Sequence, residues 1–271
     1  MGSSSRAAQY TNQYIIKMVI CKTGVFFFGL LKSDLENCCT EQKKSGKIRE
    51  MRKIFRLIRT EKEGRKMKNP LRYQLTEYDC GPASMLNAIS YLFERKDIPP
   101  EVIRNIMLYC LDCHSKEGVP GKRGTSRAAM AFLCNWLNEY GELGLLPISG
   151  EHIIGNGVCI GTESRINYAL CHGGVAVVRL YLDEPHYVLM TGTEGDAIRM
   201  FDPYWLDHLP KEDIQITEDH PREYNRIVPV KYFNSESTDV YALGPKEERE
   251  AVILYNRRTK TEPEEVIEYF I

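Results

Sequence analysis

Three β-prone runs follow one another between residues 175 and 201, and they restrict the possible folds of this chain more than any other feature. Val175–Leu182, His186–Thr191 and Ala197–Phe201 are rich in apolar, β-branched and aromatic residues. Only the short turns Asp183–Pro185 and Gly192–Asp196 separate them, which is typical of consecutive strands. Strands joined by such short turns pair antiparallel, so an antiparallel sheet is expected here.

The preceding hundred residues have the periodicity of helices instead. From Cys80 to about Arg95, apolar residues recur at intervals of three and four, as on one face of a helix. Further helices are expected at about Glu101–Leu111, at about Arg127–Tyr140 behind a Thr125–Ser126 cap, and at Thr162–Leu170. The sequence therefore predicts an α+β fold, with an N-terminal helical part packed on the sheet.

The remaining segments are predicted less specifically. Gly141–Gly157 has the composition of a loop, and Tyr204–Arg222 is irregular and acidic. Further strands that complete the sheet could form at Tyr224–Phe233 and Ala251–Arg257. A short terminal helix could form at Pro263–Tyr269.

Charge divides the chain into two parts. The formal net charge is −1, but residues 43–68 carry twelve basic and three acidic side chains, and residues 69–271 have a net charge of −11. Residues 1–66 are therefore interpreted as a basic N-terminal extension and residues 67–271 as the folded domain. Because basic residues dominate one part of the chain and acidic residues the other, the net charge of the whole chain does not indicate a partner. No nucleic-acid partner is expected.

Several interpretations of the extension remain open. Lys47–Arg59 could form a basic amphipathic helix that binds an anionic surface, or a solvated and disordered segment. Met67 is also a plausible start, since codons for Lys62–Lys66 are compatible with a purine-rich ribosome-binding stretch; residues 1–66 would then not be native. Lys17 and Lys22 interrupt the apolar region Tyr14–Leu31, so no integral membrane segment is expected.

The nine cysteines do not have the spacing of a small disulfide framework. Their number is odd, and no clear signal peptide precedes them, so a reducing, cytoplasmic location is expected. Cys110-Leu-Asp-Cys113-His114 matches the pattern for covalent haem attachment, but that attachment needs an oxidising compartment. A zinc site would need a further ligand. We therefore interpret the two cysteines as incidental, and no metal or cofactor is expected.

Cys80 has the setting of a nucleophile. It opens the first predicted helix, with Pro82 suited to the first turn, and a helix N-terminus favours thiolate over thiol. The alternative is an inert buried cysteine beside a turn. Asp79, directly before the cysteine, is expected to cap the helix and to have no catalytic role.

The predicted hairpin supplies the other groups that cysteine catalysis needs. His186 begins one strand and Asp202 ends its neighbour, so both fall at the same end of the hairpin and can make contact. A catalytic cysteine uses such a histidine as base and a third group to orient it. Gln74 could donate its side-chain amide to the developing oxyanion, together with the backbone N–H of Cys80.

This combination resembles the papain-like cysteine peptidases, most closely the C39-like peptidase group. The resemblance covers about residues 70–205 and lies in Gln74 before Asp79-Cys80-Gly81-Pro82-Ala83, then His186-Tyr-Val, then Asp202-Pro203. It implies a papain-like fold and a thiol protease in which the nucleophile is Cys80, the base His186, the orienter Asp202 and the oxyanion donor Gln74. Gly81 would leave room for the substrate backbone.

The resemblance also implies a peptide or protein substrate. Members fused to ATP-driven exporters are bacterial enzymes that remove leader peptides, whereas this sequence contains no transporter segment and no Walker-type loop. Two alternatives stay open. The same residues serve acyltransferases and transglutaminase-like enzymes, in which an amine replaces water, and a papain-like fold can also be a non-catalytic peptide-binding module.

Overall fold

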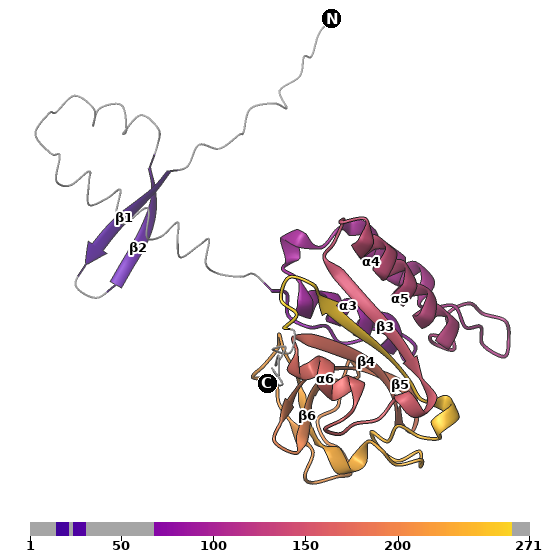
Figure 1. The fold of residues 1–271 in the computed structure, drawn as a ribbon. Coiled ribbons are helices and arrows are strands. Elements are labelled where there is room, and N and C mark those ends of the chain that lie inside the picture. Colours follow the sequence, from indigo (N-terminus) through magenta and orange to yellow (C-terminus); the bar gives the residue numbers. More distant parts are fainter. Residues whose placement is uncertain (1–14, 22–23, 31–67, 262–271) are drawn as a thin grey trace, which may run out of the picture. The chain divides into compact units, whose positions relative to one another are not determined.

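The computed structural model describes residues 15–21, 24–30 and 68–261 of the chain (Figure 1). Two compact units are distinguished, Met1–Arg65 and Lys66–Ile271. In the first, strands β1 (Ile15–Cys21) and β2 (Gly24–Leu30) pair antiparallel. The helices expected at Lys47–Arg59 and Pro263–Tyr269, and the alternative start at Met67, lie outside the described residues.

A seven-stranded antiparallel sheet forms the base of the second unit, in the order β3-β9-β4-β5-β6-β8-β7. Its strands are β3 (Ile148–Ile154), β4 (Gly174–Leu182), β5 (Glu184–Glu194), β6 (Ala197–Phe201), β7 (Gln215–Ile216), β8 (Arg226–Pro229) and β9 (Glu250–Asn256). Hydrophobic clusters cover both faces of this sheet. This explains why β4 reads as an almost continuous apolar run and does not alternate with polar residues.

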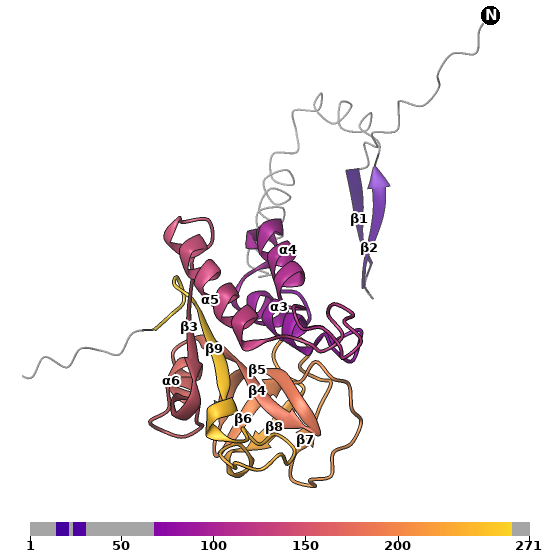
Figure 2. The same ribbon diagram turned by 90° about the vertical axis from the view of Figure 1, so that its right-hand side faces the viewer.

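The helices precede or interrupt the strands along the chain, as the sequence predicts. They are α3 (Cys80–Leu92), α4 (Pro100–Tyr109), α5 (Arg127–Glu142) and α6 (Arg165–Cys171). Pro100 occupies the first turn of α4, where its missing N–H costs no hydrogen bond. Ser126 caps α5, because its Oγ accepts the backbone N–H of Ala129 at 3.1 Å. The predicted α+β arrangement of N-terminal helices on an antiparallel sheet is confirmed (Figure 2).

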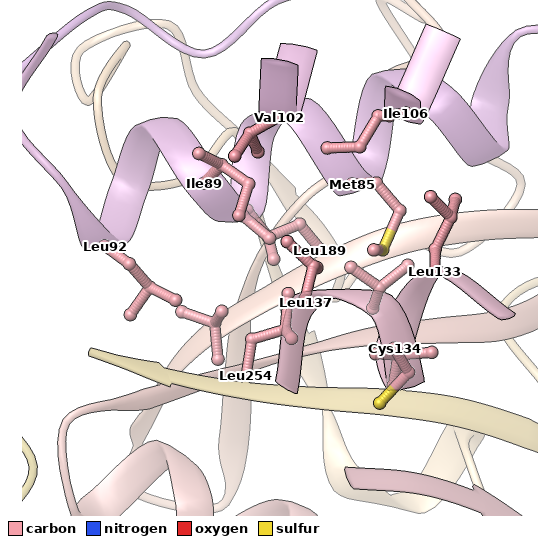
Figure 3. Packing of buried hydrophobic residues seen from close by; sticks show 14 of the residues in the cluster. Met85, Ile89, Leu92, Val102, Ile106, Leu133, Cys134, Leu137, Leu189 and Leu254 are labelled. Atoms are coloured by element: carbon pink, nitrogen blue, oxygen red, sulfur yellow. The ribbon is translucent and has the colours of Figure 1, made fainter. Parts of the chain in front are cut away.

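Helices α3 and α5 pack their apolar sides against one face of the sheet, and α4 packs on α3 and α5 (Figure 3). The cluster includes Met85 and Ile89 of α3, Leu133 and Leu137 of α5, and Leu189 of β5. On the opposite face, α6 and the segment after β8 cover the strands with a second cluster that includes Ile166, Ala169, Met190, Phe233 and Tyr241. Helix α3 is thus held against the centre of the sheet by burial of apolar surface.

Several boundaries differ from those predicted. Gly141–Gly157 was expected to be a loop but contains the whole of β3, whose alternation is weak because Gly150 and polar side chains interrupt it. Tyr224–Phe233 contributes only the four residues of β8 before a 3₁₀ turn, Val230–Tyr232, begins after Pro229. The expected turn at Gly192–Asp196 is shorter, since β5 continues to Glu194 and Gly195 turns the chain with φ of 57°.

None of the helices in the described part of the chain combines the length and the apolar character needed to cross a membrane.

Replacement of Leu133 by alanine tests the packing of α5 on the sheet. Leu133 is completely buried, so we expect the free energy of unfolding to fall by about 2–5 kcal/mol through lost burial and an unfilled cavity. Leu143→Ala is the matched control at the end of the same helix, since Leu143 is 74% exposed; it should change stability by less than about 0.5 kcal/mol. Urea unfolding of both variants measures the difference, and equal effects would contradict this packing.

Candidate active site

Cys80 is the first residue of α3 and is almost completely buried. Its backbone N–H has no hydrogen-bond partner within residues 68–261, and Ala83 is the first residue whose N–H bonds back, to the carbonyl of Asp79 at 2.9 Å. The start of the helix therefore presents unpaired donors beside the thiol. Asp79 does not cap the helix as expected: its carboxylate accepts the backbone N–H and the hydroxyl of Thr76 and so closes the preceding turn.

His186 and Asp202 form a buried pair at one end of the sheet. His186 lies near the start of β5, and Asp202 directly follows β6, the strand paired with β5. The Nε2 atom of His186 lies 2.7 Å from Oδ1 of Asp202. The two side chains are 7% and 0% exposed, so solvent does not screen their interaction. The contact expected from the hairpin pattern is present.

The Cys80 thiol lies near enough to the same imidazole to contribute to the raised pKa of His186. Since Nε2 is bonded to Asp202, the ring nitrogen left for the thiol is Nδ1. Helix α3 is fixed to β5 beside this point, because the hydroxyl of Ser84 donates to the carbonyl of Tyr187 at 2.9 Å. Residues separated by more than a hundred positions thus come together in the group Cys80–His186–Asp202.

The charge state of the pair follows from these contacts. Burial alone would lower the pKa of His186, but the Asp202 carboxylate and the neighbouring Cys80 outweigh it and raise this pKa to about 10. Burial alone would raise the pKa of Asp202, but His186, with further donors, holds it below its usual value. At neutral pH the pair is therefore imidazolium and carboxylate.

Both carboxylate oxygens of Asp202 accept hydrogen bonds. In addition to His186, Oδ1 accepts the backbone N–H of Tyr204, and Oδ2 accepts the hydroxyl of Tyr241, each at 2.8 Å. The side chain of Asn225 holds the backbone at this point, since its Oδ1 accepts the N–H of Asp202 and its Nδ2 donates to the carbonyl of Asp202. A buried carboxylate needs such hydrogen bonds to stay ionised.

Gln74 reaches the same end of the sheet through its backbone. Its N–H donates to the carbonyl of Pro203 at 2.9 Å, which ties the segment before α3 to the turn that carries Asp202. Its Nε2 donates one hydrogen to the carbonyl of Thr76 at 2.8 Å and keeps a second. Its Oε1 is buried without a partner in the described part of the chain.

Gly81 has a packing reason to lack a side chain. A Cβ at this position would lie 2.1 Å from Oγ1 of Thr125, so the loop before α5 occupies the space against the start of α3. The expectation that Gly81 leaves room for a substrate backbone stays a prediction.

A cavity of about 490 Å³ opens beside Cys80, between the start of α3, the loop before α5 and the turn between β4 and β5. Its lining is mostly polar and charged, with Glu77, Tyr78, Lys122, Arg123, Arg179, Glu184 and Tyr187 among its residues. The cavity offers charges of both signs beside the thiol.

The Cys110-Leu-Asp-Cys113-His114 motif lies at the end of α4 and in the loop after it. Cys110 is completely buried, and burial raises the pKa of its thiol well above the usual value; that of Cys113 is raised as well. No group of three or more His, Cys, Asp or Glu side chains suited to a metal ion occurs among the described residues. The thiols have the character of neutral side chains in this setting.

Neither protein-family models nor curated protein sequences give a match to this chain.

The structure brings Cys80, His186 and Asp202 together and places Gln74 next to the turn after Asp202. The sequence reasoning did not identify Tyr241, Asn225 or Ser84, which support these residues. No sequence motif singles them out, since each is an ordinary residue type at an ordinary spacing. Their role depends on contacts between segments 23 to 103 positions apart.

The raised pKa of His186 predicts how stability varies with pH. The folded state holds a proton that the unfolded state releases above about pH 6.5, so the stabilisation is complete below that pH and is lost as pH rises towards about 10. The test compares the free energies of unfolding of Cys80→Ala and Cys80→Ala/His186→Gln. The first variant should be the more stable, and the difference between the two should shrink by more than about 1 kcal/mol as pH rises across this window. Urea unfolding at a series of pH values measures it; a constant difference would show that His186 is not held as the cation.

Proposed function

We propose that residues 68–261 form a papain-like cysteine peptidase domain, closest to the C39-like peptidase group, that hydrolyses amide bonds of a peptide or protein through Cys80. One observation carries the proposal: a helix-opening cysteine, a histidine and a carboxylate come together, with Nε2 of the histidine bonded to the carboxylate at 2.7 Å. This is the relation of nucleophile, base and orienting group that acyl transfer to a thiol requires. The α+β arrangement of helices on an antiparallel sheet agrees with it.

In the first half-reaction the Cys80 sulfur, as thiolate, attacks the carbonyl carbon of the scissile amide. The imidazolium of His186 then gives its proton to the leaving nitrogen, the C–N bond breaks, and an amine departs from a Cys80 thioester. In the second half-reaction the now neutral His186 removes a proton from water, which attacks the thioester and releases a carboxylic acid and the thiol group. Asp202 holds the imidazole in the tautomer that serves both steps.

The oxyanion of each tetrahedral intermediate needs donors beside the thiol. The backbone N–H of Cys80 is unpaired within residues 68–261, and Gln74 keeps one amide hydrogen after its bond to Thr76. We assign these two groups to the oxyanion, because an unpaired donor fixed by a helix start needs no reorganisation when the charge develops. The tie between Gln74 and Pro203 would keep the amide at the same end of the sheet as His186.

The group that accepts the acyl chain from the Cys80 thioester distinguishes the proposal from the acyltransferase and transglutaminase-like alternative. The same residues would form the thioester, and an amine would replace water in the second half-reaction. No observed feature of the cavity beside Cys80 selects an amine. A peptide-binding module without turnover is a weaker alternative, because binding alone gives no reason to hold an imidazolium between a buried carboxylate and a thiol.

Alkylation by iodoacetamide tests the nucleophile directly. At pH 6 to 7 we expect Cys80 to react at least about tenfold faster than an ordinary thiol, because His186 beside it can act as its base. His186→Gln should reduce that rate to the ordinary value, and Cys80→Ala should abolish labelling at this position, as read by mass spectrometry of the peptide that contains residue 80. Cys171 is an internal reference in the same sample, since it is exposed and distant in sequence from the triad residues.

Digestion of a peptide library then tests turnover. The wild type should release new carboxyl termini, His186→Gln and Cys80→Ala should lower that release by at least about a thousandfold, and an added primary amine should leave the products unchanged. Amine-linked products would favour the transferase alternative. Binding of peptides without any product, together with an unreactive Cys80, would favour the binding module and overturn the proposal.

A further inference from the structure

Tyr241 contacts the far side of Asp202 and is absent from every motif in the sequence. Its hydroxyl donates to Oδ2 of Asp202 at 2.8 Å, opposite the oxygen that faces His186. Tyr241 is completely buried. The residue comes from the segment between β8 and β9, 39 positions after Asp202, so only the fold brings the two together.

The backbone at Tyr241 has a conformation that side chains seldom adopt. Its φ is 63°, in the left-handed region that disfavours residues with a Cβ. Hydrogen bonds to β4 hold it there, since the N–H of Tyr241 donates to the carbonyl of Tyr181 at 2.7 Å and the N–H of Tyr181 donates to the carbonyl of Ala242 at 2.9 Å. Such strain persists where the surroundings fix a residue firmly, and it is common beside functional groups.

Arg226 is a buried cation in the same region of the fold. It is 1% exposed, and its charge opposes the rise in the pKa of the Tyr241 phenol. Its two terminal nitrogens donate to the carbonyls of Asn225 and Leu206, at 2.9 and 3.0 Å.

We propose that Tyr241 is a positioning residue: its hydroxyl keeps the Asp202 carboxylate ionised and aimed at Nε2 of His186. The effect of Tyr241 on catalysis rests on the proposed function, whereas its effect on Asp202 and His186 depends only on the fold. The groups that face His186 are Asp202, the Cys80 thiol from α3 and the ring of Tyr204, which meets the imidazole edge-on at 6.3 Å. Those that face Asp202 from other segments are Tyr241 and Asn225.

The protonation of Tyr241 agrees with this role. Burial and the charge of Asp202 raise the pKa of its phenol well above the usual value, against the opposing effect of Arg226. The hydroxyl therefore stays a donor throughout the range in which His186 titrates. A tyrosine that only filled the core could be replaced by phenylalanine without effect on His186.

Tyr241→Phe separates positioning from packing, because it removes the hydroxyl and keeps the ring. In a Cys80→Ala background, ¹³C-labelled histidine resonances follow the titration of His186 without the thiol, and His186→Gln assigns the signal among the six histidines. We expect Tyr241→Phe to raise the His186 midpoint by about one pH unit, since a carboxylate that has lost this donor is more basic and holds the proton of the His186–Asp202 pair more tightly. Tyr181→Phe is the matched control: it removes a tyrosine–carboxylate bond to Glu248 elsewhere and should leave the midpoint unchanged.

With Cys80 restored, peptide hydrolysis gives a second measurement. Tyr241→Phe should lower kcat about tenfold, change KM by less than about twofold, and move the alkaline limb of the pH profile to higher pH. An unchanged His186 midpoint in Tyr241→Phe would overturn the inference whether or not the protein is a peptidase. A shifted midpoint in a protein without hydrolysis would instead support the inference and remove the proposed function.

If Tyr241→Phe does not fold, the wild-type protein still decides. The hydroxyl proton of Tyr241 should then be visible by NMR as a slowly exchanging resonance that disappears when Asp202 is replaced by alanine. Absence of that resonance in the folded wild type would count against the bond to Asp202.

Discussion

The burial of one carboxylate governs how this domain is put together. Asp202 is completely enclosed, so its charge is tolerated only because three donors surround its two carboxylate oxygens. These donors come from β5, from the turn after β6 and from the segment between β8 and β9, while Asn225, just before β8, holds the backbone of Asp202. A break in any of these contacts would leave a charge in an apolar interior, which costs several kcal/mol. The site and the stability of the fold therefore depend on the same contacts.

The antiparallel sheet makes that arrangement possible. Strands β5 and β6 are neighbours joined by a tight turn, so the start of one and the end of the other fall side by side. Helix α3 crosses the same end, held by apolar packing through Met85 and Ile89 and by the bond from Ser84 to the carbonyl of Tyr187. The thiol reaches the imidazole as a consequence of packing, because residues 80 and 186 have no local connection.

Part of this could be predicted from the sequence, because local patterns encode it. Helix α3, the central strands and the cap of α5 follow from periodicity, turn residues and a serine at the right position. Strand β3 was missed because Gly150, Glu151 and His152 hide its alternation, and its place in the sheet is due to pairing with β9 almost a hundred residues later. The role of Asp79 was wrong because Thr76, three residues earlier, competes for its carboxylate.

The sequence alone determined which residues could do chemistry. A cysteine at a helix start, with a histidine and an aspartate on adjacent strands, can be recognised because helix periodicity, turn length and strand pairing are local properties of the chain. Only the tertiary structure decided how Asp202 stays charged, since Tyr241 reaches its carboxylate and Asn225 its backbone through contacts between distant segments. It also decided that Thr125 fills the space at Gly81. The physical reason is the same in each case. The burial and hydrogen bonding of a residue depend on which distant segments pack against it, and the local sequence does not encode those segments.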